Sequence, residues 1–184
     1  SAPEKKILSS PHEYESSCPL CPGNQRVSGE RNPDYNSIFI FDNDHPAFAL
    51  PAPSNRVIDN SPFVSAPAGG LCRVVCYSPI HNKTLAHLSI DETRKLIDAW
   101  AEQTIELMSY EKIEQVLIFE NSGELVGVSN SHPHAQIYAT EFVMEGFRKE
   151  TRAFEKSSSP LMESLLVAEI LDGRRMLYEG SEVC

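Results

Sequence analysis

Two histidines and a glutamine stand at alternate positions in the segment His132-Pro-His134-Ala-Gln136. If the segment is a β-strand, these three side chains lie on one face, about 7 Å apart along the strand. An imidazole can bind a metal ion or attack phosphorus, and a neutral amide can donate a hydrogen bond to a phosphate oxygen. Because His-x-His pairs are common by chance, two partly buried polar histidines are the alternative interpretation.

The pair Cys18-Pro-Leu-Cys21 could also carry chemistry. A thioredoxin-like redox site would have a strand before the pair and a helix after it, whereas the flanks here are rich in Ser, Gly and Asn. Two idle exposed cysteines are a second interpretation. The third is a zinc half-site, which needs two more ligands from elsewhere, and His81 and His132 are the candidates.

In the zinc interpretation, His134 is left as the functional imidazole. An unperturbed histidine, with a pKa of about 6.5, is mostly neutral at pH 7, as a nucleophile should be. A metal ion bound by His132 would fix the segment that carries His134 without entering the chemistry. Ser129 and Asn130 offer further hydrogen-bond donors beside it.

The elements that must position these residues are short strands and separate helices. Residues 1–36 lack hydrophobic periodicity, which predicts an irregular arm. Ser89 and Glu92 form a capping-box pattern ahead of an amphipathic helix over about 90–110. The remaining expected elements are strands at 38–41, 72–77, 116–119 and 132–140, a proline-rich loop over 51–70, helices at 145–156 and 161–171, and a strand from 175–178. We expect the strands at 116–119 and 132–140 to pair as a hairpin, which predicts an α+β fold.

Composition excludes several classes of function. The 184 residues predict one domain, with or without an appendage. A net charge of −10 opposes binding to nucleic acid or to an anionic membrane. We see neither a membrane span nor a signal peptide, so a cytoplasmic protein is expected. The odd count of five cysteines does not suit a secreted disulfide framework, and Cys72 and Cys76 are interpreted as reduced core thiols.

Taken together, the motifs resemble those of the galactose-1-phosphate uridylyltransferases, a branch of the histidine-triad superfamily. The resembling segments are Cys18-x-x-Cys21, Gly23–Val27, Asn32–Tyr35, Asn43-Asp44, Ser78–Leu85, Phe119–Gly123 and Ser129–Gln136. The resemblance implies a histidine-triad-like antiparallel sheet with helices packed on it over residues 37–184. It also implies that residues 1–36 are an arm tied to this domain by zinc.

The resemblance further implies a two-step exchange through a covalent intermediate. His134 would attack the α-phosphorus of UDP-glucose, releasing glucose 1-phosphate, and galactose 1-phosphate would then accept the uridylyl group. Gln136 stands where related hydrolases carry a third histidine, which favours transfer over hydrolysis. The alternatives are a related nucleotidyltransferase or phosphorylase for another nucleotide sugar, and a catalytically silent, zinc-stabilised nucleotide-binding module.

Site residues follow from the same resemblance. Zinc would be held by Cys18, Cys21, His81 and His132. The uridine and phosphate pocket would be lined by Val27, Asn43, Asp44, Asn121, Gly127, Val128, Ser129 and Gln136. Glu150 aligns with a carboxylate that binds a second metal ion, often Fe²⁺, and a solvated helix charge is the alternative there. Val128 and Ser131 stand where the family usually has cysteine and proline.

Family members carry two similar halves, and this chain resembles the first. Residues that contact the sugar phosphate are therefore expected outside it. We also expect a surface that normally packs against the second half to promote self-association, as a homodimer.

Overall fold

The computed structural model describes residues 12–52, 58–60, 62–126, 128, 130–157 and 160–175. Contacts divide the chain into two compact units, residues 1–142 and 143–184. The arm and the sheet belong to the first unit. The expected boundary between the arm and the domain, near residue 36, stays a prediction, and the contacts divide the chain after residue 142.

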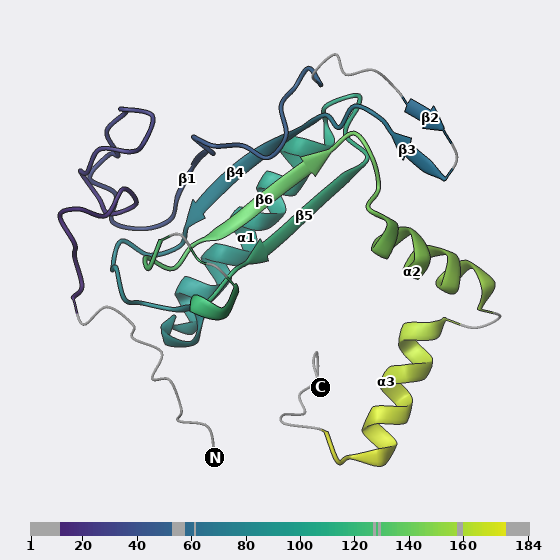
Figure 1. The fold of residues 1–184 in the computed structure, drawn as a ribbon. Coiled ribbons are helices and arrows are strands. Elements are labelled where there is room, and N and C mark those ends of the chain that lie inside the picture. Colours follow the sequence, from purple (N-terminus) through teal and green to yellow (C-terminus); the bar gives the residue numbers. More distant parts are fainter. Residues whose placement is uncertain are drawn as a thin grey trace, which may run out of the picture. The chain divides into compact units, whose positions relative to one another are not determined.

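A four-stranded sheet forms the centre of the first unit (Figure 1). Its strands are β1 (Phe39–Asp42), β4 (Gly70–Cys76), β5 (Gln115–Glu120) and β6 (Ala135–Thr140). They lie in the order β1-β4-β6-β5, and each neighbouring pair is antiparallel. The α+β class and the pairing of the two motif-bearing strands are confirmed. β6 begins only at Ala135, so the prediction of a strand from residue 132 was wrong for its first three residues.

The central strand β4 is buried on both faces, because successive side chains point to opposite sides of a sheet. Val75 packs with Ile137 of β6 in the core beneath helix α1. Val74 and Cys76 point the other way and pack against the arm, where Leu20 contacts them. The sheet therefore has a helix on one face and the arm on the other.

Helix α1 (Ile90–Met108) covers the first of these faces and lies behind the sheet in Figure 1. It begins where predicted: Glu92 N–H donates to the Ser89 hydroxyl, and the Glu92 carboxylate accepts from the Ser89 amide. These bonds satisfy amides that have no partner within the helix. Leu96 and Leu107 are buried against the sheet.

The arm is irregular, as predicted, but its loops are held by specific hydrogen bonds. The buried Asn32 amide donates to the carbonyl oxygens of Pro19 at 2.8 Å and Cys21 at 3.0 Å. The Tyr35 hydroxyl donates to the carbonyl of Leu20 at 2.5 Å. These bonds replace regular secondary structure and fix the Cys-x-x-Cys turn against the sheet.

The loop expected over 51–70 contains a small antiparallel sheet, so that prediction was wrong for part of the segment. Strand β2 (Ile58–Asn60) pairs with β3 (Phe63–Ser65). Pro62 lies in the turn between the strands, where it removes no hydrogen bond from the pairing. Proline content alone could not distinguish a loop from a hairpin that has proline at its turn.

The remaining described helices agree with the sequence. In the second unit, α2 spans Glu145–Lys156 and α3 spans Leu161–Asp172, as predicted. Two short 3-10 helices, η1 (Leu85–His87) and η2 (Glu124–Val126), lie in loops of the first unit. The strand predicted from 175–178 falls largely outside the described residues. Within the described residues, no helix is long and apolar enough to cross a membrane.

The α1 core makes a stability prediction. Leu107→Ala removes a fully buried side chain and should lower the free energy of unfolding by about 2–5 kcal/mol. Ile105, on the same helix, is 74% exposed, so Ile105→Ala should change it by less than about 1 kcal/mol. Urea unfolding followed by circular dichroism would measure both. Equal losses from the two variants would mean that α1 packs through a different face.

Candidate active site and metal centre

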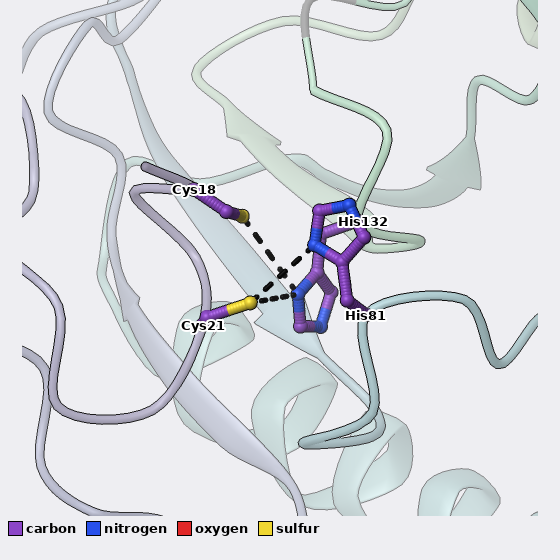
Figure 2. Close-up of side chains that lie close together, drawn as sticks. All are labelled: Cys18, Cys21, His81 and His132. Atoms are coloured by element: carbon purple, nitrogen blue, oxygen red, sulfur yellow. Dashed lines mark hydrogen bonds between the residues drawn. The ribbon is translucent and has the colours of Figure 1, made fainter. Parts of the chain in front are cut away.

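Four side chains from distant parts of the sequence meet beside the sheet (Figure 2). Cys18 and Cys21 come from the arm, His81 follows β4, and His132 precedes β6, and all four are buried. The Cys21 Sγ lies 3.4 Å from His81 Nδ1 and 3.5 Å from His132 Nδ1. The Cys18 Sγ lies 3.9 Å from His132 Nδ1. The structure thus brings together the ligand set expected from the sequence.

These distances suit a tetrahedral metal site. With Zn–S bonds near 2.3 Å and Zn–N bonds near 2.0 Å, sulfur and nitrogen ligands lie about 3.6 Å apart. The three distances between Sγ and Nδ1 lie on either side of that value, and the four donor atoms are all within 4.8 Å of one another. The residues present therefore fit a zinc ion without rearrangement of the chain.

The second nitrogen of each metal-facing imidazole has its own partner. His132 Nε2 lies 2.9 Å from the carbonyl oxygen of Ser78, and His81 Nε2 lies 2.9 Å from the Ser131 hydroxyl oxygen. A carbonyl can only accept, so His132 carries its proton on Nε2 and keeps the Nδ1 lone pair for a metal ion. The Leu20 amide also donates to the Cys18 sulfur at 3.3 Å.

Burial favours the neutral imidazoles that metal binding requires. It lowers the pKa of His132 to about 4 and lowers that of His81 as well, so the protonated rings are disfavoured at pH 7. Burial also raises the pKa of the Cys18 thiol, because a thiolate loses hydration there. A bound cation would offset that cost and release the thiol protons.

A cavity of about 260 Å³ lies on the arm side of the sheet. The residues that line it come from the arm, from β1 and the turn after it, from β4, from the segment that leads into β6, and from β6 itself. They are Pro19, Leu20, Arg26, Val27, Phe41, Asn43, Asp44, His45, Val74, Asn130, His134, Gln136 and Tyr138. The expected nucleophile, His134, thus lies in one cavity with five of its expected neighbours: Val27, Asn43, Asp44, Asn130 and Gln136.

The ring orientation of His134 fixes its tautomer. Its Nδ1 lies 2.8 Å from the carbonyl oxygen of His132, so Nδ1 must carry the proton and donate. Nε2 then holds a free lone pair at the cavity. Because the acceptor carbonyl belongs to a residue of the buried cluster, the backbone of that cluster sets the direction of the His134 ring.

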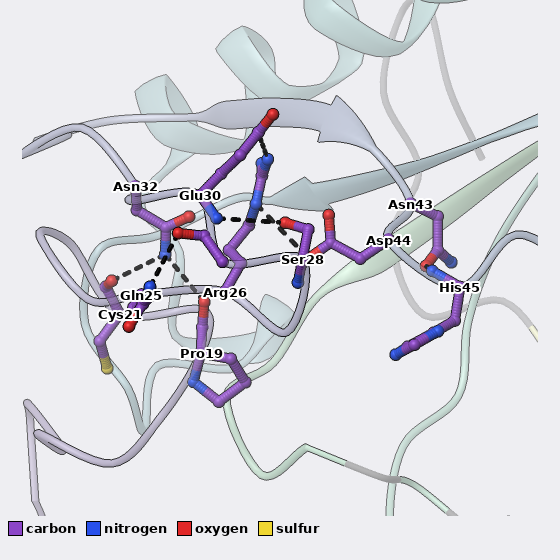
Figure 3. A network of polar contacts seen from close by, with 11 residues as sticks. Pro19, Cys21, Gln25, Arg26, Ser28, Glu30, Asn32, Asn43, Asp44 and His45 are labelled. Atoms are coloured by element: carbon purple, nitrogen blue, oxygen red, sulfur yellow. Dashed lines mark hydrogen bonds and ion pairs between the residues drawn. The ribbon is translucent and has the colours of Figure 1, made fainter.

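A charged network from the arm and the turn after β1 lies at the cavity, which Arg26 and Asp44 line (Figure 3). The Arg26 side chain is 8% exposed and makes ion pairs with Glu30 and, at 3.5 Å, with Asp44. Its guanidinium carbon lies 4.2 Å above the Phe41 ring. The Ser28 amide donates to the Asp44 carboxylate at 3.4 Å. The Arg26 guanidinium and the Ser28 amide therefore hold the Asp44 side chain in place at the cavity.

Comparison with known proteins identifies the fold and its family. A family model described as galactose-1-phosphate uridyl transferase, N-terminal domain, matches residues 2–144. The chain belongs to this family.

Its relatives are similar over most of this chain but are longer proteins. The galactose-1-phosphate uridylyltransferase of Haemophilus influenzae is 42% identical over 139 residues, covering 76% of this chain and 39% of that protein. The enzyme of Rattus norvegicus is 40% identical over 150 residues, covering 82% and 39%. A solved uridylyltransferase structure superposes with a TM-score of 0.66 at 30% identity, covering 83% of this chain and 49% of that one. This chain spans about two fifths of the length of these two curated relatives.

The other site residues expected from the family resemblance lie away from the cavity or outside the described residues. Asn121 is exposed just after β5, and neither it nor Val128 is among the described residues that line this cavity. Gly127 and Ser129 are outside the described residues. Glu150 is exposed on α2 and joins no metal-binding group within the described part of the chain.

Sequence reasoning missed several cavity residues. Arg26 is next to the expected Val27 and His45 is next to the expected Asp44, so adjacency could have suggested both. Tyr138 follows Gln136 by two positions, and strand alternation places both on one face. Phe41 and Val74 gave no signal beyond their apolar character, because core and cavity walls draw on the same residue types.

The metal centre predicts a coupled loss of metal and stability. Cys21→Ala should reduce bound zinc from about one ion per chain to near zero, and the thermal midpoint should fall with it. Cys72→Ala is the matched control, because Cys72 is buried outside the cluster. It should keep its zinc and lose only about 1 kcal/mol of packing. Metal analysis and thermal unfolding would show both effects, and full zinc content in Cys21→Ala would contradict the assignment.

Proposed function

We propose that this chain carries the nucleophile of a UDP-glucose–hexose-1-phosphate uridylyltransferase of galactose metabolism, the activity named for its relatives. The observation that carries the proposal is His134. Its Nδ1–H donates a hydrogen bond to a backbone carbonyl, and its ring lines a cavity together with a carboxylate and three side-chain amides. A neutral imidazole with one free, directed nitrogen is suited to nucleophilic attack.

The proposed first step forms a bond between His134 Nε2 and the α-phosphorus of UDP-glucose. The bond from phosphorus to the glucose 1-phosphate oxygen breaks, and that group leaves with the electron pair. Positive charge then develops on the ring, whose Nδ1–H donates to the His132 carbonyl oxygen. This acceptor stabilises the charge without taking the proton.

The proposed second step reverses the first with another sugar phosphate. A phosphate oxygen of galactose 1-phosphate attacks the same phosphorus, and the N–P bond breaks with its electrons returning to Nε2. UDP-galactose forms, and no proton has to leave Nδ1 in either step. Dividing one displacement into two predicts ping-pong kinetics.

The charged and polar groups of the cavity favour one orientation of a bound nucleotide. The Asp44 carboxylate would repel a diphosphate, whereas it can accept hydrogen bonds from ribose hydroxyls. The Gln136 amide can donate to a non-bridging phosphate oxygen without titrating. We propose that uridine lies against the arm and the turn after β1, with Val27, Asn43 and Asp44, and that the reacting phosphate lies at His134 and Gln136.

We assign zinc to the buried Cys18, Cys21, His81 and His132 cluster, as a structural ion that holds the segment bearing His134. All four ligands are protein side chains, as is usual for structural zinc. Glu150 as a ligand for a second ion such as Fe²⁺ is a further proposal, which rests on the family resemblance alone.

Self-association as a dimer and a cytoplasmic location also remain proposals. Apolar side chains exposed on α1 support the first, since Ile90, Ile97 and Ile105 are each more than half exposed.

The proposed intermediate is directly testable. Incubation of the zinc-loaded chain with UDP-glucose should add the mass of one uridylyl group, and acid should remove it. His134→Ala should abolish the adduct while zinc content and the thermal midpoint stay near wild type. His87→Ala is the matched control, because that imidazole lies outside the cavity, and it should still form the adduct. Intact-mass measurement would detect these species, and an adduct on His134→Ala would refute the assignment.

Gln136 gives a second test. Gln136→His places an imidazole where it can accept a proton from an attacking water molecule. The uridylyl adduct should then hydrolyse about 10²-fold faster, releasing UMP. Gln136→Ala is the control that removes the amide without supplying a base. UMP release from the isolated adduct would measure the rates, and equal hydrolysis by both variants would rule out this role of residue 136.

A further inference from the structure

Ser131 contacts the metal cluster without being one of its ligands. It directly precedes His132 in the chain, yet its hydroxyl oxygen lies 2.9 Å from Nε2 of the other histidine, His81. The two histidines are thus treated differently: the backbone carbonyl of Ser78 holds His132, and a side chain holds His81. The family resemblance places proline at position 131, so nothing in it assigns a role to this hydroxyl.

The bond has a definite direction once His81 binds a cation. A metal ion at Nδ1 needs the lone pair of that nitrogen, so the proton must be on Nε2. Nε2–H then donates to the Ser131 oxygen, which fixes both the tautomer and the rotation of the ring. Partners of this kind orient metal ligands and raise their basicity, and their loss typically costs 10- to 100-fold in metal affinity.

We propose that Ser131 is a positioning residue of the metal centre, whose hydroxyl orients the His81 ring and raises the affinity of the site for zinc. The inference rests on the zinc site proposed above, but not on uridylyl transfer. It also connects two distant segments. Ser131 links the segment after β4 to the segment before β6, and three residues later that segment carries His134.

The surroundings of the bond allow an experiment on this hydroxyl alone. Ser131 is exposed, so its substitution leaves no buried cavity. Among the described residues, its side chain makes one hydrogen bond, the contact with His81. Ser131→Ala removes that bond, and Ser131→Thr keeps the hydroxyl as a conservative rescue.

The readout is the dissociation constant for zinc, measured on the full chain by competition with a chromophoric chelator at fixed pH. Ser131→Ala should bind zinc about 10- to 100-fold more weakly than wild type. Ser131→Thr should return the constant to within about threefold. Circular dichroism of the zinc-loaded proteins would show that each variant is folded.

A second background separates ring orientation from any general effect on the loop. His81→Cys replaces the imidazole with a thiolate, giving a Cys₃His site of a kind that also binds zinc. A thiolate has no N–H that could donate to the Ser131 hydroxyl. Adding Ser131→Ala in this background should therefore change the dissociation constant for zinc by less than about twofold. The same 10- to 100-fold loss in both backgrounds would show that Ser131 acts through the loop and would overturn the proposal.

The remaining outcomes are also decisive. Wild-type affinity in Ser131→Ala would overturn the role of the hydroxyl. A wild-type chain that takes up no zinc would overturn both the metal site and this inference. Normal zinc binding with the expected Ser131 effect but no uridylyl adduct would overturn the proposed reaction alone.

Discussion

The buried meeting of two sulfurs and two imidazole nitrogens is the interaction on which the rest of this structure depends. It joins the arm to the chain after β4 and the chain before β6, across sequence separations of 60 and 111 residues. The backbone pairing inside the arm is limited to turns and an isolated antiparallel bridge between Gln25 and Arg31. The cluster and the hydrogen bonds of Asn32 add further restraint, and the arm then forms one wall of the cavity.

The chemistry of His134 follows from the same restraint. Its ring is not directed by a carboxylate, as in a serine-protease triad, but by the carbonyl of a residue in the cluster. A carbonyl can neither take the proton nor change its charge. The carbonyl thereby holds the ring with its proton on Nδ1, which suits the nucleophilic role proposed above.

Local patterns predicted the elements, whereas for the site they offered several interpretations, among which the resemblance favoured zinc. The capping box before α1 and the alternation of β4 depend on neighbours in sequence, so both could be predicted without a structure. The four cluster residues are far apart, and spacing alone left three interpretations of Cys18 and Cys21 open. The β2–β3 hairpin was missed because proline content does not report where in a segment the prolines lie. Arg26 was missed because its burial depends on Phe41 and Asp44, which are distant in the sequence.

The cavity has walls from two layers, the arm through Leu20 and Arg26 and the sheet through Val74 and Tyr138. A molecule in the cavity can contact both walls only when the arm is packed against the sheet. A metal ion at the cluster needs the same packing, because Cys18 and Cys21 come from the arm. Thermodynamic linkage then makes the two binding events reciprocal: whatever factor the ion contributes to nucleotide affinity, the nucleotide returns to the ion. In the reaction proposed above, an ion at the cluster would in this way govern how tightly the nucleotide is held, although it takes no part in the chemistry.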